Sequence, residues 1–206
     1  MFRRFISEQL NHPTGIIGRC LLPFIWNRRN RALNDITLSR LQPQQEDRIL
    51  DVGFGGGYLI GRLLNIVTNG RICGVDASKS ILEHGRTRFA RAINAGTLDI
   101  QCCGVDSLPY PDRSFSKVCS VNSLFYWPDV HRGVCEIYRV LSPGGLVLLT
   151  FTSKEDLDKR GFSPELVHSF ADKEVIDLLL DAGFSDVRLE QGKDNNRRFG
   201  VVTGRK

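Results

Sequence analysis

Two acidic residues, Asp51 and Asp76, stand at the ends of apolar segments of this sequence. A glycine-rich segment follows the first of them. Residues 49–52 are apolar apart from Asp51 and lead into glycines at positions 53, 55, 56 and 57, while the apolar residues 72–75 end at Asp76. A strand that ends in a glycine-rich turn lets a ligand lie against bare backbone, and a carboxylate at the tip of the next strand can accept hydrogen bonds from both hydroxyls of a ribose. The spacing therefore indicates a site for an adenosine-type cofactor at the carboxyl ends of parallel strands.

The glycine spacing distinguishes between such cofactors. The dinucleotide pattern G-x-G-x-x-G needs a third glycine for close helix packing, but counting from Gly53 that position holds Tyr58. The sequence instead has acid-x-G-x-G-x-G, formed by Asp51, Gly53, Gly55 and Gly57. An acid in this place would repel a diphosphate but suits a ligand that carries an ammonium and a sulfonium. The simpler alternative is a glycine loop with no nucleotide role, whose turn Asp51 only orients.

Length and cysteine usage favour one large domain without disulfides or a metal site. Chains the size of this one, with 206 residues, bury roughly 70% of their unfolded surface and need no cross-links to be stable. None of the six cysteines stands in C-x-x-C spacing, and the four histidines never pair at the spacing of metal ligands. We therefore expect buried free thiols in a reducing compartment, a cytoplasmic protein and no bound metal.

The net charge of +5 is concentrated near the N-terminus, because residues 1–40 hold seven arginines against two acids. The apolar run at 16–26 is interrupted and falls short of the ~20 residues that a membrane-spanning helix needs, and no signal-peptide cleavage pattern follows it. We expect residues 1–41 to form a helical arm that folds over the site as a lid and makes peripheral contact with an anionic membrane surface. The alternative is a helical pad that only covers the sheet.

Apolar periodicity predicts that strands and helices alternate along the rest of the chain. The expected strands are 48–52, 71–75, 98–102, 117–121 and 146–151, and the expected helices are 27–41, 59–69, one that begins at Ser78 or Ser80, 129–141 and 172–182. Such alternation implies a parallel sheet with right-handed crossovers, to which a terminal hairpin of 187–190 and 198–203 adds one antiparallel strand. The expected fold is α/β, a Rossmann-like doubly wound seven-stranded sheet, in a single domain whose core is 42–206.

Four segments of the chain match one protein family in order and spacing. They are the glycine loop at 51–57, Gly74-Val75-Asp76-Ala77-Ser78, Asp106-Ser107-Leu108-Pro109-Tyr110 and Arg139-Val140-Leu141-Ser142-Pro143-Gly144-Gly145. Residues 48–151 thus resemble class I methyltransferases that use S-adenosylmethionine (SAM), in the small-molecule branch typified by the ubiquinone and menaquinone enzymes. The resemblance implies that the glycine loop follows the methionine part of SAM, Asp76 binds the ribose hydroxyls and Asp106 reaches the adenine amino group. The cofactor-binding residues that it implies are Asp51, Gly53, Gly55, Gly57, Asp76, Ala77, Asp106, Ser107 and Asn122.

Several of these residues also have a simpler interpretation. Asp76 could cap a helix, and Asp106 could bind its own backbone in a turn. Tyr126 and Trp127 could be core aromatics or a stacking wall for the substrate, and His168 fits a solvated helix residue better than a base. The sequence nominates no catalytic base.

The expected activity is SAM-dependent methyl transfer to a small, apolar or aromatic acceptor that enters over the carboxyl ends of the strands at 117–121 and 146–151. Residues 122–127 lack the N/D-P-P-Y/F pattern that grips an amino group on a base, which argues against a nucleic-acid substrate. Two alternatives remain open: a nicotinamide-dependent reductase and a non-catalytic SAM-binding module. The sequence nominates neither the accepting atom nor an oligomeric state.

Overall fold

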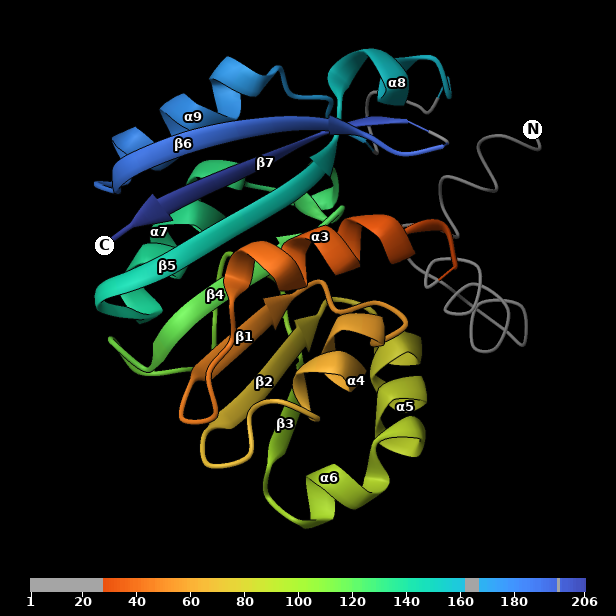
Figure 1. Ribbon diagram of the computed structural model, residues 1–206, viewed down its shortest axis with the longest axis vertical. Coiled ribbons are helices and arrows are strands. Elements are labelled where there is room, and N and C mark those ends of the chain that lie inside the picture. Colours follow the sequence, from red (N-terminus) through yellow and green to blue (C-terminus); the bar gives the residue numbers. More distant parts are fainter. Residues whose placement is uncertain (1–27, 162–166, 196) are drawn as a thin grey trace.

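The computed structural model describes residues 28–161, 167–195 and 197–206. Within these residues one seven-stranded sheet has the order β3-β2-β1-β4-β5-β7-β6 (Figure 1). The strands are β1 (Arg48–Val52), β2 (Arg71–Asp76), β3 (Leu98–Cys102), β4 (Phe115–Val121), β5 (Leu141–Thr152), β6 (Ser185–Lys193) and β7 (Arg198–Arg205). Strand β7 is antiparallel to both of its neighbours, and the other pairs are parallel. The expected mixed sheet is confirmed.

Helices cover both faces of the sheet (Figure 1). They are α3 (Arg31–Leu41), α4 (Tyr58–Leu63), α5 (Lys79–Arg88), α6 (Ala90–Asn94), α7 (Val130–Val140), α8 (Lys154–Asp158) and α9 (Asp172–Asp181), with a 3-10 turn, η2 (Leu124–Tyr126). One apolar cluster joins α3, α4 and α5 to the sheet, and another joins α7 and α9 to it. This two-sided burial explains why the central strands are almost continuously apolar, and it confirms the doubly wound arrangement.

Helix α3 packs its apolar face against the sheet. Its residues Leu33, Thr37 and Leu41 lie one turn apart and are buried, as the spacing predicts. The hydroxyl of Thr37 lies 2.7 Å from that of Thr150 on β5. Residues 1–27, which make up most of the expected lid and would make its membrane contact, lie outside the described residues. The division into arm and core therefore stays a prediction.

Some element boundaries differ from those expected. The helix expected from position 78 is capped by Ser78 and not by Ser80, since the Ser78 hydroxyl accepts from the N–H of Ile81 at 3.4 Å. It breaks at Phe89, whose ring lies where a Cβ on Gly57 would be. Strand β5 begins at Leu141 and not at residue 146 as expected, and its pairing with β4 is irregular before Leu146. Helix α8 was not expected, because its segment lacks clean apolar periodicity.

The cysteines are only partly as predicted. Cys73 and Cys119 are buried, whereas Cys102 and Cys135 are exposed, so the expectation of buried thiols is wrong for Cys102 and Cys135.

In the described parts of the chain, no helix combines the length and apolar character needed to cross a membrane.

Candidate functional site

Strand β1 ends in a turn that places bare backbone at the edge of the sheet. Gly53, Gly55 and Gly57 have φ angles of 74°, 51° and 70°, in the left-handed region that glycine adopts at no steric cost. The N–H of Gly53 donates to the carbonyl of Val75 at 2.8 Å, which closes the turn against the end of β2. A Cβ on Gly53 would lie 2.5 Å from Cβ of Ser123. The backbone conformation of the turn therefore disfavours any residue other than glycine, and at Gly53 the neighbouring Ser123 also leaves no room for a side chain.

Replacing Gly53 tests how far this turn controls ligand binding. Gly53→Ala and the control Gly96→Ala impose the same strain, since both glycines have φ near +74°, but nothing lies within 4 Å of a Cβ on Gly96. The strain alone costs roughly 1–2 kcal/mol. We expect Gly96→Ala to lose about that much stability in denaturant titrations and to keep ligand affinity. Gly53→Ala should lose more stability and most of its cofactor affinity; equal losses in both variants would show that the collision with Ser123 is irrelevant.

Asp76 fastens the glycine turn to the end of β2. One carboxylate oxygen accepts from the N–H of Gly55 at 3.1 Å, and the other accepts from the N–H of Ser78 at 2.9 Å. Burial raises the pKa of Asp76 to about 6, although these two hydrogen bonds act to lower it. A carboxylate has about four lone-pair sites, so Asp76 keeps capacity for ligand hydroxyls. The cap of α5 is Ser78, so Asp76 holds the turn before the helix and does not cap the helix itself.

Asp51 is a buried carboxyl group whose side chain has no hydrogen bond or ion pair within the described residues. Burial, reinforced by the charge of Asp76, raises the pKa of Asp51 to about 7. Holding an ionised carboxylate in such a place costs free energy unless a donor or a cation comes to it. A perturbed acid that lines a cavity is a candidate ligand-binding group.

A cavity of about 400 Å³ lies at the carboxyl ends of β1, β2 and β4. This volume falls in the usual range for small-molecule sites. Of the residues expected from the sequence, Asp51, Gly53, Gly55, Asp76, Ala77 and Asn122 line the cavity, whereas Gly57, Asp106 and Ser107 do not. The structure thus brings together residues from three strands that lie far apart in the chain.

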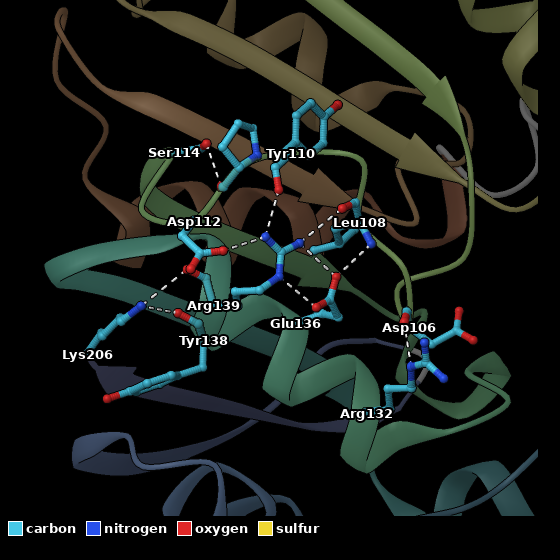
Figure 2. A network of polar contacts seen from close by, with 11 residues as sticks. Asp106, Leu108, Tyr110, Asp112, Ser114, Arg132, Glu136, Tyr138, Arg139 and Lys206 are labelled. Carbon is cyan, nitrogen blue, oxygen red and sulfur yellow. Dashed lines mark hydrogen bonds and ion pairs between the residues drawn. The ribbon is translucent and has the colours of Figure 1, made fainter.

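One arginine of α7 holds the loop before β4 in place, as Figure 2 shows. Arg139 donates to the carbonyls of Leu108 and Tyr110 at 3.0 and 2.8 Å, and to the carboxylates of Asp112 and Glu136. These hydrogen bonds and ion pairs raise the pKa of Arg139. The matched R-V-L segment therefore acts at long range, as an anchor for the loop, as well as at the turn that follows it.

Asp106 and Ser107 belong to this anchored loop. The Asp106 carboxylate lies against Gly104, where an added Cβ would collide with its Oδ1, and its carbonyl accepts from Nε of Arg132 at 2.9 Å. Ser107 is exposed. Gly104 and Val105 do line the cavity, so Asp106 stands one residue away from it.

Loosening the anchor should weaken cofactor binding. Arg139→Lys keeps the positive charge but loses the planar fork that reaches several acceptors at once. We expect affinity for the demethylated cofactor, S-adenosylhomocysteine (SAH), to fall about tenfold, or about 1.4 kcal/mol. The control Arg40→Lys removes an equally forked but exposed pair with Glu190 and should change little. Calorimetry on both variants checks this, and unchanged affinity in Arg139→Lys would contradict it.

Asn122 lines the cavity, and its side chain forms hydrogen bonds with neighbouring elements of the fold. It sits at φ 60° at the end of β4. Its Oδ1 accepts from the N–H and the hydroxyl of Thr152 at 3.0 and 2.8 Å, and its amide donates to Oδ1 of Asn30 at 3.1 Å. The residue therefore ties the ends of β4 and β5 to the start of α3.

Aromatic side chains form one wall of the cavity. Phe125 and Tyr126 meet edge to face with centroids 4.7 Å apart, and Trp127 donates from Nε1 to the hydroxyl of Ser123 at 3.1 Å. All three line the cavity, and Trp127 also packs into the core, so the core interpretation is confirmed for Trp127 and the stacking wall stays a prediction. Burial raises the pKa of Tyr126 to about 12, so its phenol is neutral at pH 7.

Three basic residues at the cavity were not expected from the sequence. They are Arg160, His168 and Arg197, whereas a fourth, Arg29, belongs to the arm that was expected to cover the site. Arg160 follows a short helix in a segment without periodicity, and Arg197 stands in what was expected to be a hairpin turn. Neither position carries a local signal, because only the packing of distant segments brings these residues to the site.

Comparison with known proteins now identifies the family. Residues 50–149 match a methyltransferase domain family. The chain is 30% identical over 167 residues to YdaC, an uncharacterized methyltransferase of Bacillus subtilis, across 81% of this chain and 87% of that protein. The chain belongs to the class I SAM-dependent methyltransferases. This membership confirms SAM as the cofactor and decides against a nicotinamide-dependent reductase.

One further relative in sequence and one solved structure are also similar to this methyltransferase. A demethylmenaquinone methyltransferase of Symbiobacterium thermophilum is 35% identical over 109 residues, which cover 52% of this chain and 43% of that enzyme. The matched part thus spans less than half of that relative's length. The crystal structure of a SAM-dependent methyltransferase from Aquifex aeolicus superposes with a TM-score of 0.68 at 20% identity, covering 84% of this chain and 89% of that one. That likeness shows the shared fold.

Proposed function

We propose that this methyltransferase holds SAM between Asp51, the glycine turn and Asp76, and transfers its methyl group to a small, apolar or aromatic molecule over β4 and β5. The observation that carries the proposal is the Asp51 carboxyl group, buried at the cavity with no partner in the described residues. The methionine ammonium and the sulfonium of SAM are positive charges that would stabilise the ionised form of this carboxyl group.

The remaining contacts of the proposed cofactor site follow from the same geometry. The free lone pairs of Asp76 accept from the two ribose hydroxyls, and the backbone at Gly53 and Gly55 lies along the methionine part. Ala77 flanks the ribose. Asp106, beside the cavity-lining Gly104, is placed for the adenine amino group, with Ser107 next to it.

The topology of the sheet supports a position for the acceptor half of the cavity. In a doubly wound sheet, ligands bind where the strand order reverses, which here is between β1 and β4. The cofactor residues lie on the β1 and β2 side, so the acceptor lies on the β4 and β5 side, against Phe125 and Tyr126. The quinone named for the Symbiobacterium relative supports a ring-shaped acceptor.

Bound SAM supplies an activated methyl group with a good leaving group. The task left to this chain is to hold the acceptor in line with the carbon–sulfur bond and to exclude water, and such positioning can be worth roughly 7–11 kcal/mol. Tyr126 can donate a hydrogen bond to the acceptor, but its raised pKa prevents it from acting as a base near neutral pH. The proposal assigns no catalytic base.

An unbiased screen tests this function. The purified protein is incubated with methyl-labelled SAM and a fractionated metabolite extract, next to an Asp51→Asn variant. We expect label in a small-molecule product with the wild-type protein and much less with the variant. If SAM binds but no extract yields a labelled small molecule, the non-catalytic SAM-binding module is the better account.

A further inference from the structure

The cavity has an acidic end and a basic end. Asp51 and Asp76 lie at the ends of β1 and β2. Arg29, Arg160 and Arg197 also line the cavity, and Arg197 reaches Thr152 at the end of β5 and is repelled by the other two arginines. Arg29 precedes α3, Arg160 follows α8, and Arg197 precedes β7. The elements that carry Arg160 and Arg197 follow β5 and sit beyond the switch point, where the proposed function places the acceptor.

Arg197 is the fixed member of this basic end. Its side chain is almost wholly buried, with 3% of the residue exposed. Its guanidinium donates to Oδ1 of Asn30 at 2.9 Å and to the hydroxyl of Thr152 at 3.3 Å, and Nε lies 3.5 Å from a carboxylate oxygen of Asp194. Nε itself has no hydrogen bond within the described residues. Arg197 thus contributes a rigid buried cation.

Arg160 is the member for which the described part of the chain provides no counter-ion within ion-pair distance. Its half-buried guanidinium lines the cavity and makes no hydrogen bond or ion pair with any described residue. Burial and the repulsion of Arg29 lower the pKa of Arg160. The carboxylate of Asp156 is engaged elsewhere, by Lys159 at 3.0 Å and by the N–H of Arg198 at 2.6 Å.

Three cations that converge on one cavity repel one another until an anion joins them. Among the described residues Asp194 lies within ion-pair distance of Arg197, and Asp156 and Asp194 offset the charge of Arg160 only from a greater distance. A guanidinium presents a planar fork of donors that matches a carboxylate or phosphate group. Aromatic Tyr126 also lines this cavity, and the charges of Arg160 and Arg29 both act to lower the pKa of its phenol. The site therefore combines an apolar surface with an anchor for negative charge.

We infer that the methyl acceptor carries an anionic oxygen group, of carboxylate type, which binds Arg160 within this basic end while its apolar body lies against Tyr126. The inference rests on the proposed function for the identity of the ligand as acceptor. The carboxylate of SAM is attached to the same carbon as the ammonium that Asp51 binds and is repelled by Asp51, so it is the competing anion for this basic end, and the SAH affinity measured below distinguishes the two. Arg160 stands across the switch point, on the acceptor side.

A matched pair of probes tests this charge preference without any turnover. Phenylacetate and the similarly shaped but uncharged phenylacetamide are titrated by calorimetry into the full chain saturated with SAH. Arg160→Gln is compared with Arg91→Gln, because Arg91 is exposed on α6 and does not line the cavity. Because charge-assisted hydrogen bonds are stronger than neutral ones, we expect at least about tenfold preference for phenylacetate. Arg160→Gln should remove this preference and leave SAH affinity intact, and Arg91→Gln should change neither.

Three results would overturn the inference: equal binding of the two probes, no saturable binding of phenylacetate, or a preference that survives in Arg160→Gln. A loss of SAH affinity in Arg160→Gln would also overturn it, because the arginine would then hold the methionine carboxylate of the cofactor. The expected preference would stand even if the metabolite screen gave no product, in which case the proposed function alone would fail.

Discussion

Asp76→Ala should reduce the affinity for SAM by about ten- to several-hundred-fold, because hydrogen bonds from ribose hydroxyls to a carboxylate are worth roughly 1.5–3 kcal/mol each. The structure places this loss toward the upper end of the range. The same carboxylate also accepts from the N–H groups of Gly55 and Ser78, so its removal loosens the glycine turn as well. Calorimetry with SAM on a variant that circular dichroism shows to be folded gives the number.

Asp106→Ala is the matched comparison for Asp76→Ala. Its carboxylate stands beside Gly104 and outside the residues that line the cavity, and the proposed contact is a single one with the adenine amino group. We therefore expect a smaller loss of affinity than in Asp76→Ala. The reverse order would show that the two acids are wrongly placed relative to the cofactor.

Protonation of Asp51 should control cofactor binding near neutral pH. The pKa values of Asp51 and Asp76 are raised to about 7 and about 6, so the folded free protein binds more protons than the unfolded chain between about pH 4 and pH 7. The free protein consequently loses stability as the pH rises through this window. The cationic groups of SAM favour the ionised carboxylates, so binding should release protons, and the affinity should fall as the pH drops from about 8 to about 5.

Asp51→Asn should have opposite effects on stability and on binding. Without the buried charge the free protein should melt at a higher temperature at pH 8, while SAM affinity falls by about ten- to a hundred-fold, in line with roughly 1.5–3 kcal/mol for a hydrogen bond to a charged group. Asp99→Asn is the control, because Asp99 lies on β3 and does not line the cavity. Proton release is measured by calorimetry in buffers of different ionisation enthalpy. A wild-type affinity that does not vary with pH would contradict the role given to Asp51.

The sequence predicts the fold and the acidic half of the site well, because both rest on local pattern. An apolar strand that runs through Asp51 into glycines, and another that ends at Asp76, can meet in a parallel sheet only at its carboxyl edge. Asn122 was also found at the cavity. Its hydrogen bonds to Thr152 and Asn30 could not be foreseen, because they depend on how α3 docks over the sheet.

The basic half of the site escapes sequence reasoning for a physical reason. Arg160 and Arg197 occupy segments without apolar periodicity, and what makes them unusual is the burial and mutual repulsion that tertiary packing imposes. The same holds for Arg139, whose motif suggested a turn but whose guanidinium anchors a loop some thirty residues earlier in the chain. Spacing identifies residues that act where a strand ends, whereas it cannot identify side chains that meet across the fold.

The central claim is that SAM lies between Asp51, the glycine turn and Asp76, and the most direct test is a crystal structure of the protein with SAH. The account predicts both ribose hydroxyls within hydrogen-bonding distance of the Asp76 carboxylate and the methionine ammonium at Asp51, with the thioether sulfur facing the aromatic wall. A nucleoside bound away from Asp76, or a methionine part that does not reach Asp51, would contradict it.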